Sequence, residues 1–161
     1  MRRYLPLLAV GILLAAAGIA TAASGPKATG GSAFFTFLGG EGKASFNAQV
    51  DKKGVTKGMV NVQITGIPAP ADFKGDVTCY SQQGNFARFS GPITEGGATD
   101  PNTGNPAQSY ELSVLDQGEP GAGNDRITVI RSEQPASPTD CQDGQTANQP
   151  IVRGNIQVHG G

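Results

Sequence analysis

Apolar and polar side chains alternate with a period of two along most of the chain. The clearest runs cover residues 44–50, 60–64, 73–79 and 110–114. Successive side chains of a β-strand point to opposite faces, so this alternation predicts strands that bury one face and expose the other. Beyond the N-terminal segment, no window of helical length shows apolar residues at helical spacing. The pattern therefore predicts an all-β protein.

Roughly eight such runs follow one another at intervals of about ten residues, which favours an antiparallel sandwich or a small barrel. Residues 116–126 lie between two alternating runs and are expected to connect a central β-hairpin, because Gly, Pro and Asx residues favour a tight reversal. Two long polar segments, 94–107 and 132–150, are expected to be loops. In the run 73–79, the alternation places Cys79 on the inward face.

The first 22 residues have the features of a secretory signal peptide. A positively charged start precedes an apolar run at 5–20, and the Ala-Thr-Ala sequence at 20–22 predicts cleavage directly after it. A spanning helix needs roughly 20 apolar residues, and this shorter run is interrupted by Pro and Gly, which argues against an uncleaved anchor. The signal peptide is expected to be followed by a flexible lead-in at 23–31 and a single β-domain at 32–159.

Net charge narrows the classes of partner. Removing the signal peptide removes two of the 12 basic residues and none of the 13 acidic ones, so the mature net charge would be 10 − 13 = −3. Mild acidity gives no electrostatic footprint for nucleic acid or an anionic membrane. With no Trp and three Tyr, the chain also offers few aromatic rings to stack on bases or sugars. The expected partner is an unknown extracellular or cell-surface molecule, with no nucleic acid and no membrane after signal cleavage.

The chain has two cysteines, Cys79 and Cys141, and both follow the predicted cleavage site. In an oxidising compartment, such a pair is expected to form one structural disulfide, which would fasten the loop at 132–150 to the strand that carries Cys79. The alternative is a redox or metal-binding pair, but neither cysteine has a Cys, His or Lys nearby in the sequence. The prediction is a secreted, extracellular protein with a disulfide bond.

Carboxylates are densest in the turn at 116–125. Four side chains there, Asp116, Glu119, Asn124 and Asp125, could ligate calcium, because Ca²⁺ takes six to eight oxygen ligands in flexible geometry. The spacing is not that of an EF-hand. The alternative is Asx-turn chemistry combined with pairing of Asp125 or Glu119 with Arg126. No other cofactor is expected.

Motifs of known catalytic classes are missing. The only histidine is His159, and there is no nucleophile elbow, zinc helix or phosphate loop. A pair of carboxylates could still serve an extracellular hydrolase, and the available glutamates are Glu41, Glu95, Glu111, Glu119 and Glu133. The preferred interpretation, with no catalytic residues, is a non-enzymatic domain that acts through surface interaction. A polymer-acting hydrolase and a calcium-stabilised structural module are the alternatives.

Several short motifs follow one another in a recognisable order: Phe35-Thr36-Phe37, Phe46-Asn47-Ala48-Gln49, Lys57-Gly58-Met59-Val60-Asn61-Val62, Gly75-Asp76-Val77-Thr78-Cys79, Asp116-Gln117-Gly118-Glu119-Pro120-Gly121, Asp125-Arg126-Ile127 and Gly154-Asn155-Ile156-Gln157-Val158-His159. Taken in this order, they resemble the motifs of a family of small secreted bacterial β modules of unassigned function. The resemblance covers about residues 32–159. It implies a secreted β-domain and carries no activity with it. The two long loops depart from the family pattern.

Overall fold

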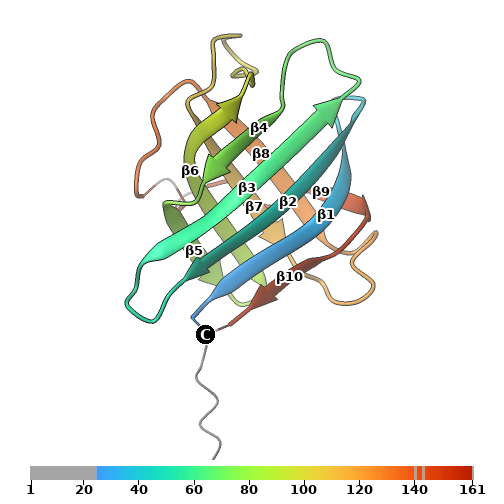
Figure 1. The fold of residues 1–161 in the computed structure, drawn as a ribbon. Coiled ribbons are helices and arrows are strands. Elements are labelled where there is room, and N and C mark those ends of the chain that lie inside the picture. Colours follow the sequence, from blue (N-terminus) through green and yellow to red (C-terminus); the bar gives the residue numbers. More distant parts are fainter. Residues whose placement is uncertain (1–24, 140, 143, 161) are drawn as a thin grey trace, which may run out of the picture.

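The computed structural model describes residues 25–139, 141–142 and 144–160 (Figure 1). These residues form ten antiparallel strands and no helix, so the all-β prediction is confirmed. Consequently, the described chain contains no helix that could cross a membrane. The strands are β1 (Lys27–Phe37), β2 (Gly40–Val50), β3 (Thr56–Thr65), β4 (Phe73–Asp76), β5 (Cys79–Gln83), β6 (Phe86–Gly96), β7 (Ser109–Leu115), β8 (Arg126–Ser132), β9 (Gln149–Arg153) and β10 (Ile156–His159).

The sheet closes on itself in an irregular ring. Its strand order is β10-β1-β2-β3-β4-β6-β7-β8-β9, and β1 also pairs with β9. The ring closes because two long strands, β1 and β6, each pair with different strands along their length. The last part of β6 pairs with β4 while its first part pairs with β5 and β7, and β1 pairs with β10 near its start and with β9 further along. Figure 1 shows the two walls of strands that result.

Aromatic rings fill the interior of the ring. Phe46 and Phe89 lie with ring centroids 5.1 Å apart, and Phe73 and Tyr110 lie 5.3 Å apart. Phe35 is also completely buried. The packing follows the alternation seen in the sequence, because the inward positions of neighbouring strands meet inside the ring. Burial of these rings is a major source of the stability of the domain.

Glycine in the strands makes room for two of these rings. A Cβ atom at Gly30 would lie 2.3 Å from the ring of its cross-strand partner Phe46. A Cβ atom at Gly42 would lie 2.5 Å from the ring of Phe35, which pairs with it. Each ring therefore covers a glycine on the adjacent strand, which explains why Phe and Gly are mixed on the inward faces.

The N-terminal boundary of the domain differs from the prediction. Strand β1 begins at Lys27, inside the segment 23–31 that was expected to be a flexible lead-in. The reason is that residues 27–30 pair with β2 on one edge and with β10 on the other, and Ala28 is completely buried. Hydrogen bonds from two neighbours order a stretch that has little to bury by itself. The predicted signal peptide at 1–22 lies outside the described residues.

Three strands extend into the segments expected to be loops. Strand β6 runs to Gly96, within 94–107, while β8 ends at Ser132 and β9 begins at Gln149, both within 132–150. Both segments are poor in large apolar side chains, so the alternation that reveals a strand is weak there. They pair because neighbouring strands offer free hydrogen-bonding edges: the end of β6 pairs with β4, and residues 149–150 pair with β8.

Cys79 does not face the core, which corrects the prediction that it points inward. The run 73–79 breaks after β4, and the chain crosses close to Gly91, where a Cβ atom would lie 1.8 Å from the carbonyl oxygen of Asp76. After the crossing the alternation has shifted by one residue. Tyr80 pairs with Phe89 and stacks on its ring at 6.4 Å, on the core side. Cys79 therefore lies on the outer face of β5.

Candidate functional site

The turn at 116–125 joins β7 to β8, as predicted, and two of its carboxylates reach strand β10. Asp116 accepts the N–H groups of Gly118 and Val158, each at 2.9 Å. Asp125, which is completely buried, accepts the N–H groups of Gln117 at 2.9 Å and Ile156 at 2.8 Å. Each aspartate thus binds its own turn with one oxygen and β10 with the other.

These contacts close the free edge of β10. The strand pairs with β1 on one side only, and residues 156 and 158 present their N–H groups on the other side. A buried N–H group without a partner is costly, and an open strand edge invites pairing with other chains. Asp116 and Asp125 take the place of a neighbouring strand, so the densest carboxylate cluster of the sequence has a structural use.

The other two predicted calcium ligands also have partners. Glu119 accepts a hydrogen bond from the side-chain amide of Asn155 at 2.6 Å, and Asn124 donates one to the carbonyl oxygen of Pro120 at 2.9 Å. Among the described residues, neither Asp125 nor Glu119 forms an ion pair with Arg126, whose guanidinium donates to the carbonyl oxygen of Asn148. Among the described residues, no three His, Cys, Asp or Glu side chains are grouped so that they could hold a metal ion.

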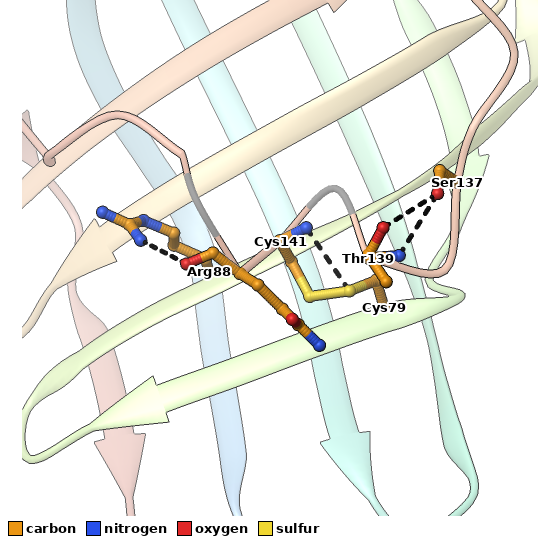
Figure 2. Close-up of a disulfide and its surroundings, with 6 residues drawn as sticks. Cys79, Arg88, Ser137, Thr139 and Cys141 are labelled. Atoms are coloured by element: carbon orange, nitrogen blue, oxygen red, sulfur yellow. Dashed lines mark hydrogen bonds between the residues drawn. A yellow bond between two sulfur atoms is a disulfide. The ribbon is translucent and has the colours of Figure 1, made fainter.

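The predicted disulfide is present. Cys79 and Cys141 are bonded, with their Cα atoms 5.7 Å apart, and both residues are buried. The backbone N–H of Cys141 also points at the sulfur of Cys79, at 3.4 Å. Figure 2 shows the bond joining the loop at 133–148 to the strand beneath it. A buried structural disulfide indicates an oxidising environment of the extracellular type.

Polar side chains on the outer face of the sheet hold the backbone of the same loop. This explains how a segment with few apolar residues can cover the sheet: its peptide groups find partners there (Figure 2). Ser113 is almost completely buried under it. The contacts run from Arg88 to the carbonyl oxygens of Gln142 and Gln145, from Ser113 to that of Gln145, from Thr128 to that of Thr146, and from the N–H of Asn148 to Thr128.

A groove of about 390 Å³ lies where the start of this loop passes over β7 and β8. Pro135 also lines two neighbouring hollows, so it forms a ridge between concave surfaces. One wall is fixed by the hydroxyl of Ser109, which donates to the carbonyl oxygen of Gln134 at 2.7 Å. The lining combines hydroxyl, amide and carboxylate groups with two apolar side chains: Ser109, Glu111, Ile130, Ser132, Gln134, Pro135 and Thr139.

The ionisable groups beside the groove serve the fold. Glu111 accepts the N–H of Gln145 at 3.2 Å, which ties the loop to β7. Tyr110 points to the core, where its hydroxyl donates to the carbonyl oxygen of Asp76 at 2.9 Å. Burial, with a smaller contribution from the charge of Asp76, raises the pKa of this phenol well above its usual range. The tyrosine therefore acts here as a neutral hydrogen-bond donor.

Of the remaining glutamates, Glu41 is exposed on β2, and Glu95 and Glu133 have different partners. Glu95 forms an ion pair with Lys74 at 2.6 Å, on the outer faces of β6 and β4. Glu133 accepts hydrogen bonds from Asn105 at 2.6 Å and from Thr103 at 3.2 Å, and so joins the two long loops. His159 is exposed at the end of β10.

The groove was not predicted from the sequence. Alternation along β7 indicated that Ser109, Glu111 and Ser113 share the polar face, but nothing in the pattern showed that a loop would cover this face. The one available signal was Cys141, because a cysteine within a polar segment predicts that the segment is fastened to something.

Comparison with known proteins identifies no relative, because no family model, curated protein or solved structure matches this chain. The resemblance to secreted β modules therefore stays a prediction. What the molecule can do has to be inferred from its own surface.

Proposed function

We propose that this protein is a secreted, non-enzymatic binding module, and that it holds an extracellular partner in the groove between the loop at 133–148 and the outer face of β7 and β8. The observation that carries the proposal is the way this loop is built. A disulfide and hydrogen bonds from Arg88, Ser113 and Thr128 fix it on a rigid sheet. Binding residues are often found on loops that a rigid scaffold positions.

The lining of the groove suits recognition. Binding sites are commonly concave, with an apolar part and a few placed polar groups that orient the ligand. Here Ile130 and Pro135 supply the apolar part, while Ser132, Gln134 and Thr139 supply hydroxyl and amide groups. Because the loop is already fastened, binding would not have to spend free energy on ordering it.

The test is a pull-down from the cell-surface fraction of the secreting organism, with the exported protein as bait. Two variants alter the groove: Ile130→Arg fills it with a long charged side chain, and Gln134→Ala removes an amide. The matched control is Gln63→Arg, at an exposed position on the outer face of β3. We expect the wild type and the control to capture the same partner and Ile130→Arg to lose it.

Two results would overturn the proposal. One is equal capture by Ile130→Arg and the wild type, with both proteins shown to be folded by their melting curves. The other is robust turnover of glycan, ester or peptide substrates by the purified wild-type protein, because the proposal includes no catalytic role.

A further inference from the structure

Lysines and exposed apolar side chains gather at one end of the molecule. The turn between β2 and β3 carries Lys52, Lys53 and Val55, all exposed, with 54% of Val55 accessible to solvent. Figure 1 shows this turn at the same end as the start of β1 and the end of β10. Next to it on β3 are Lys57 and Met59, the latter 59% exposed.

The strand register brings a fourth lysine to this end. Lys27 on β1 and Lys57 on β3 both lie opposite Gln49 of β2, so the three side chains share one row of the outer face. We call the set formed by Lys27, Lys52, Lys53, Val55, Lys57 and Met59 the basic tip. It holds four of the ten Lys and Arg residues that follow the predicted cleavage site.

Acidic groups at the tip neutralise only part of this charge. Asp51 accepts the backbone N–H groups of Lys53 at 2.8 Å and Val55 at 3.0 Å, and one of its oxygens lies 3.7 Å from the ammonium of Lys57. Asp76 pairs with Met59 in the adjacent row. Four lysines against two aspartates leave a positive surplus, although the net charge of the mature chain would be −3. The expectation of no membrane partner rested on net charge, which averages over the whole surface and conceals such a local excess.

We propose that the basic tip docks the protein on the surface of an anionic phospholipid bilayer. Clustered lysines are attracted to anionic headgroups. Val55 and Met59 favour a lipid surface over a soluble polyanion, because apolar side chains gain free energy at the edge of the acyl region and gain little beside a polyanion. Docking at the tip would hold the protein at a membrane surface, separately from any partner bound in the groove.

The segment just before β1 also lies at the basic tip. The carbonyl oxygen of Pro26 accepts the N–H of Val50, next to the turn between β2 and β3. Pro26 therefore lies beside this turn and brings the adjacent Lys27 close to it.

Vesicle co-sedimentation tests the proposal with the exported protein. The probes are vesicles of phosphatidylglycerol and phosphatidylcholine, and vesicles of phosphatidylcholine alone. We expect binding to the first only, weakening as salt rises. The double variant Lys52→Gln/Lys53→Gln should reduce the partition coefficient about 30-fold, because each lysine near an anionic surface contributes about 1 kcal/mol, which is a factor of about five.

A matched control separates the tip from total charge. Lys43→Gln/Lys74→Gln removes the same two charges from other positions on the outer face and should leave most of the binding intact. Val55→Ser/Met59→Ser should weaken vesicle binding without changing its salt dependence. The proposal fails if the two lysine pairs have equal effects or if phosphatidylglycerol vesicles are not bound at low salt. It also fails if polyglutamate is bound as tightly as the vesicles and Val55→Ser/Met59→Ser makes no difference.

Discussion

At the scale of single residues, Asp125 shows how a side chain can substitute for a strand. It is completely buried, and its two oxygens accept the N–H groups of Gln117 and Ile156. Gly121 packs against it so closely that a Cβ atom there would lie 2.3 Å from the carboxylate. The turn is therefore constructed around this carboxylate, which joins it to β10.

Asp125→Ala should lower the free energy of unfolding by about 3 kcal/mol, because the buried N–H of Ile156 and the part-buried N–H of Gln117 would lose their acceptor, at a cost of about 1–3 kcal/mol for a buried group. Asp125→Asn should also destabilise, since an amide has one accepting oxygen and would turn its NH₂ toward the other donor. Urea unfolding measures both. Glu119→Gln, at an exposed position, is the control and should change stability little. Equal stability of Asp125→Asn and wild type would contradict this role.

Asp100 ties the two long loops together and should make stability depend on pH. The N–H groups of Asn102 and then Glu133 lower the pKa of this carboxyl below its ordinary value. Because the pKa is lower in the folded state, ionised Asp100 stabilises the fold fully at pH values above its unfolded-state pKa, near 4. This stabilisation is lost as the pH falls through the folded-state pKa.

We expect the wild-type melting temperature to fall between about pH 5 and pH 2, and Asp100→Asn to start lower and show a shallower fall. Melting curves at a series of pH values measure this. Glu41→Gln, which alters an exposed carboxylate on β2, is the control and should keep the wild-type slope. An unchanged slope in Asp100→Asn would show that other carboxyls account for the acid sensitivity.

At the scale of elements, the sequence predicted most of the strands, but it did not predict where the chain changes pairing partners or which faces a loop covers. Alternation identified the inward positions of β3 and β7, and the disulfide pairing is confirmed. The orientation of Cys79 was wrong, because counting along one strand cannot reveal that the chain changes partners between β4 and β5. Ser90 and Ser113 are buried although they lie on the outer face, since a loop distant in sequence covers them.

Cys141→Ser should release the loop at 133–148 from the outer face of the sheet. The loss of a native disulfide in a small secreted domain typically costs about 2–5 kcal/mol, and we expect a loss in this range. Without the disulfide, the loop would be held mainly by hydrogen bonds such as those from Arg88 and Ser113. Because these are weaker than the packing of the core, the loop should open locally before the domain unfolds. Limited proteolysis followed by mass spectrometry should find the first cleavages within 133–148. The double variant Cys79→Ser/Cys141→Ser should behave like the single one, and first cleavage elsewhere would contradict the role of the bond.

At the scale of the whole molecule, the closure of the sheet into a ring could not be predicted from the pattern of apolar and polar residues. Strand β1 pairs with β9 and β10, which come from the other end of the chain, and side-chain alternation does not state which edges meet. Composition likewise showed where the carboxylates are dense, but it could not show that N–H groups of β10 would occupy them. The calcium interpretation rests on that density alone and stays a prediction.

Export is a prediction that concerns the whole chain. Mass spectrometry of protein recovered from the growth medium should find Ala23 as the first residue, because the sequence ahead of it has the order of charged, apolar and small residues that signal peptidases recognise. Protein found only inside cells, or with residues 1–22 retained, would contradict this expectation. A tip-bound fraction on the cell surface would agree with both export and the docking proposed above.

The last prediction decides between a turn held by N–H groups and a turn held by calcium. Free Ca²⁺ at a concentration 100 times its Kd would add about 2.7 kcal/mol to the stability of the folded state. For a domain of this size, that would raise the melting temperature by about 8 °C. Asp116 and Asp125 already accept backbone N–H groups with both oxygens, so we expect calorimetry to give the same curve with Ca²⁺ and with EDTA. A rise with Ca²⁺ that disappears in Glu119→Gln would instead mean that these side chains rearrange to ligate the ion.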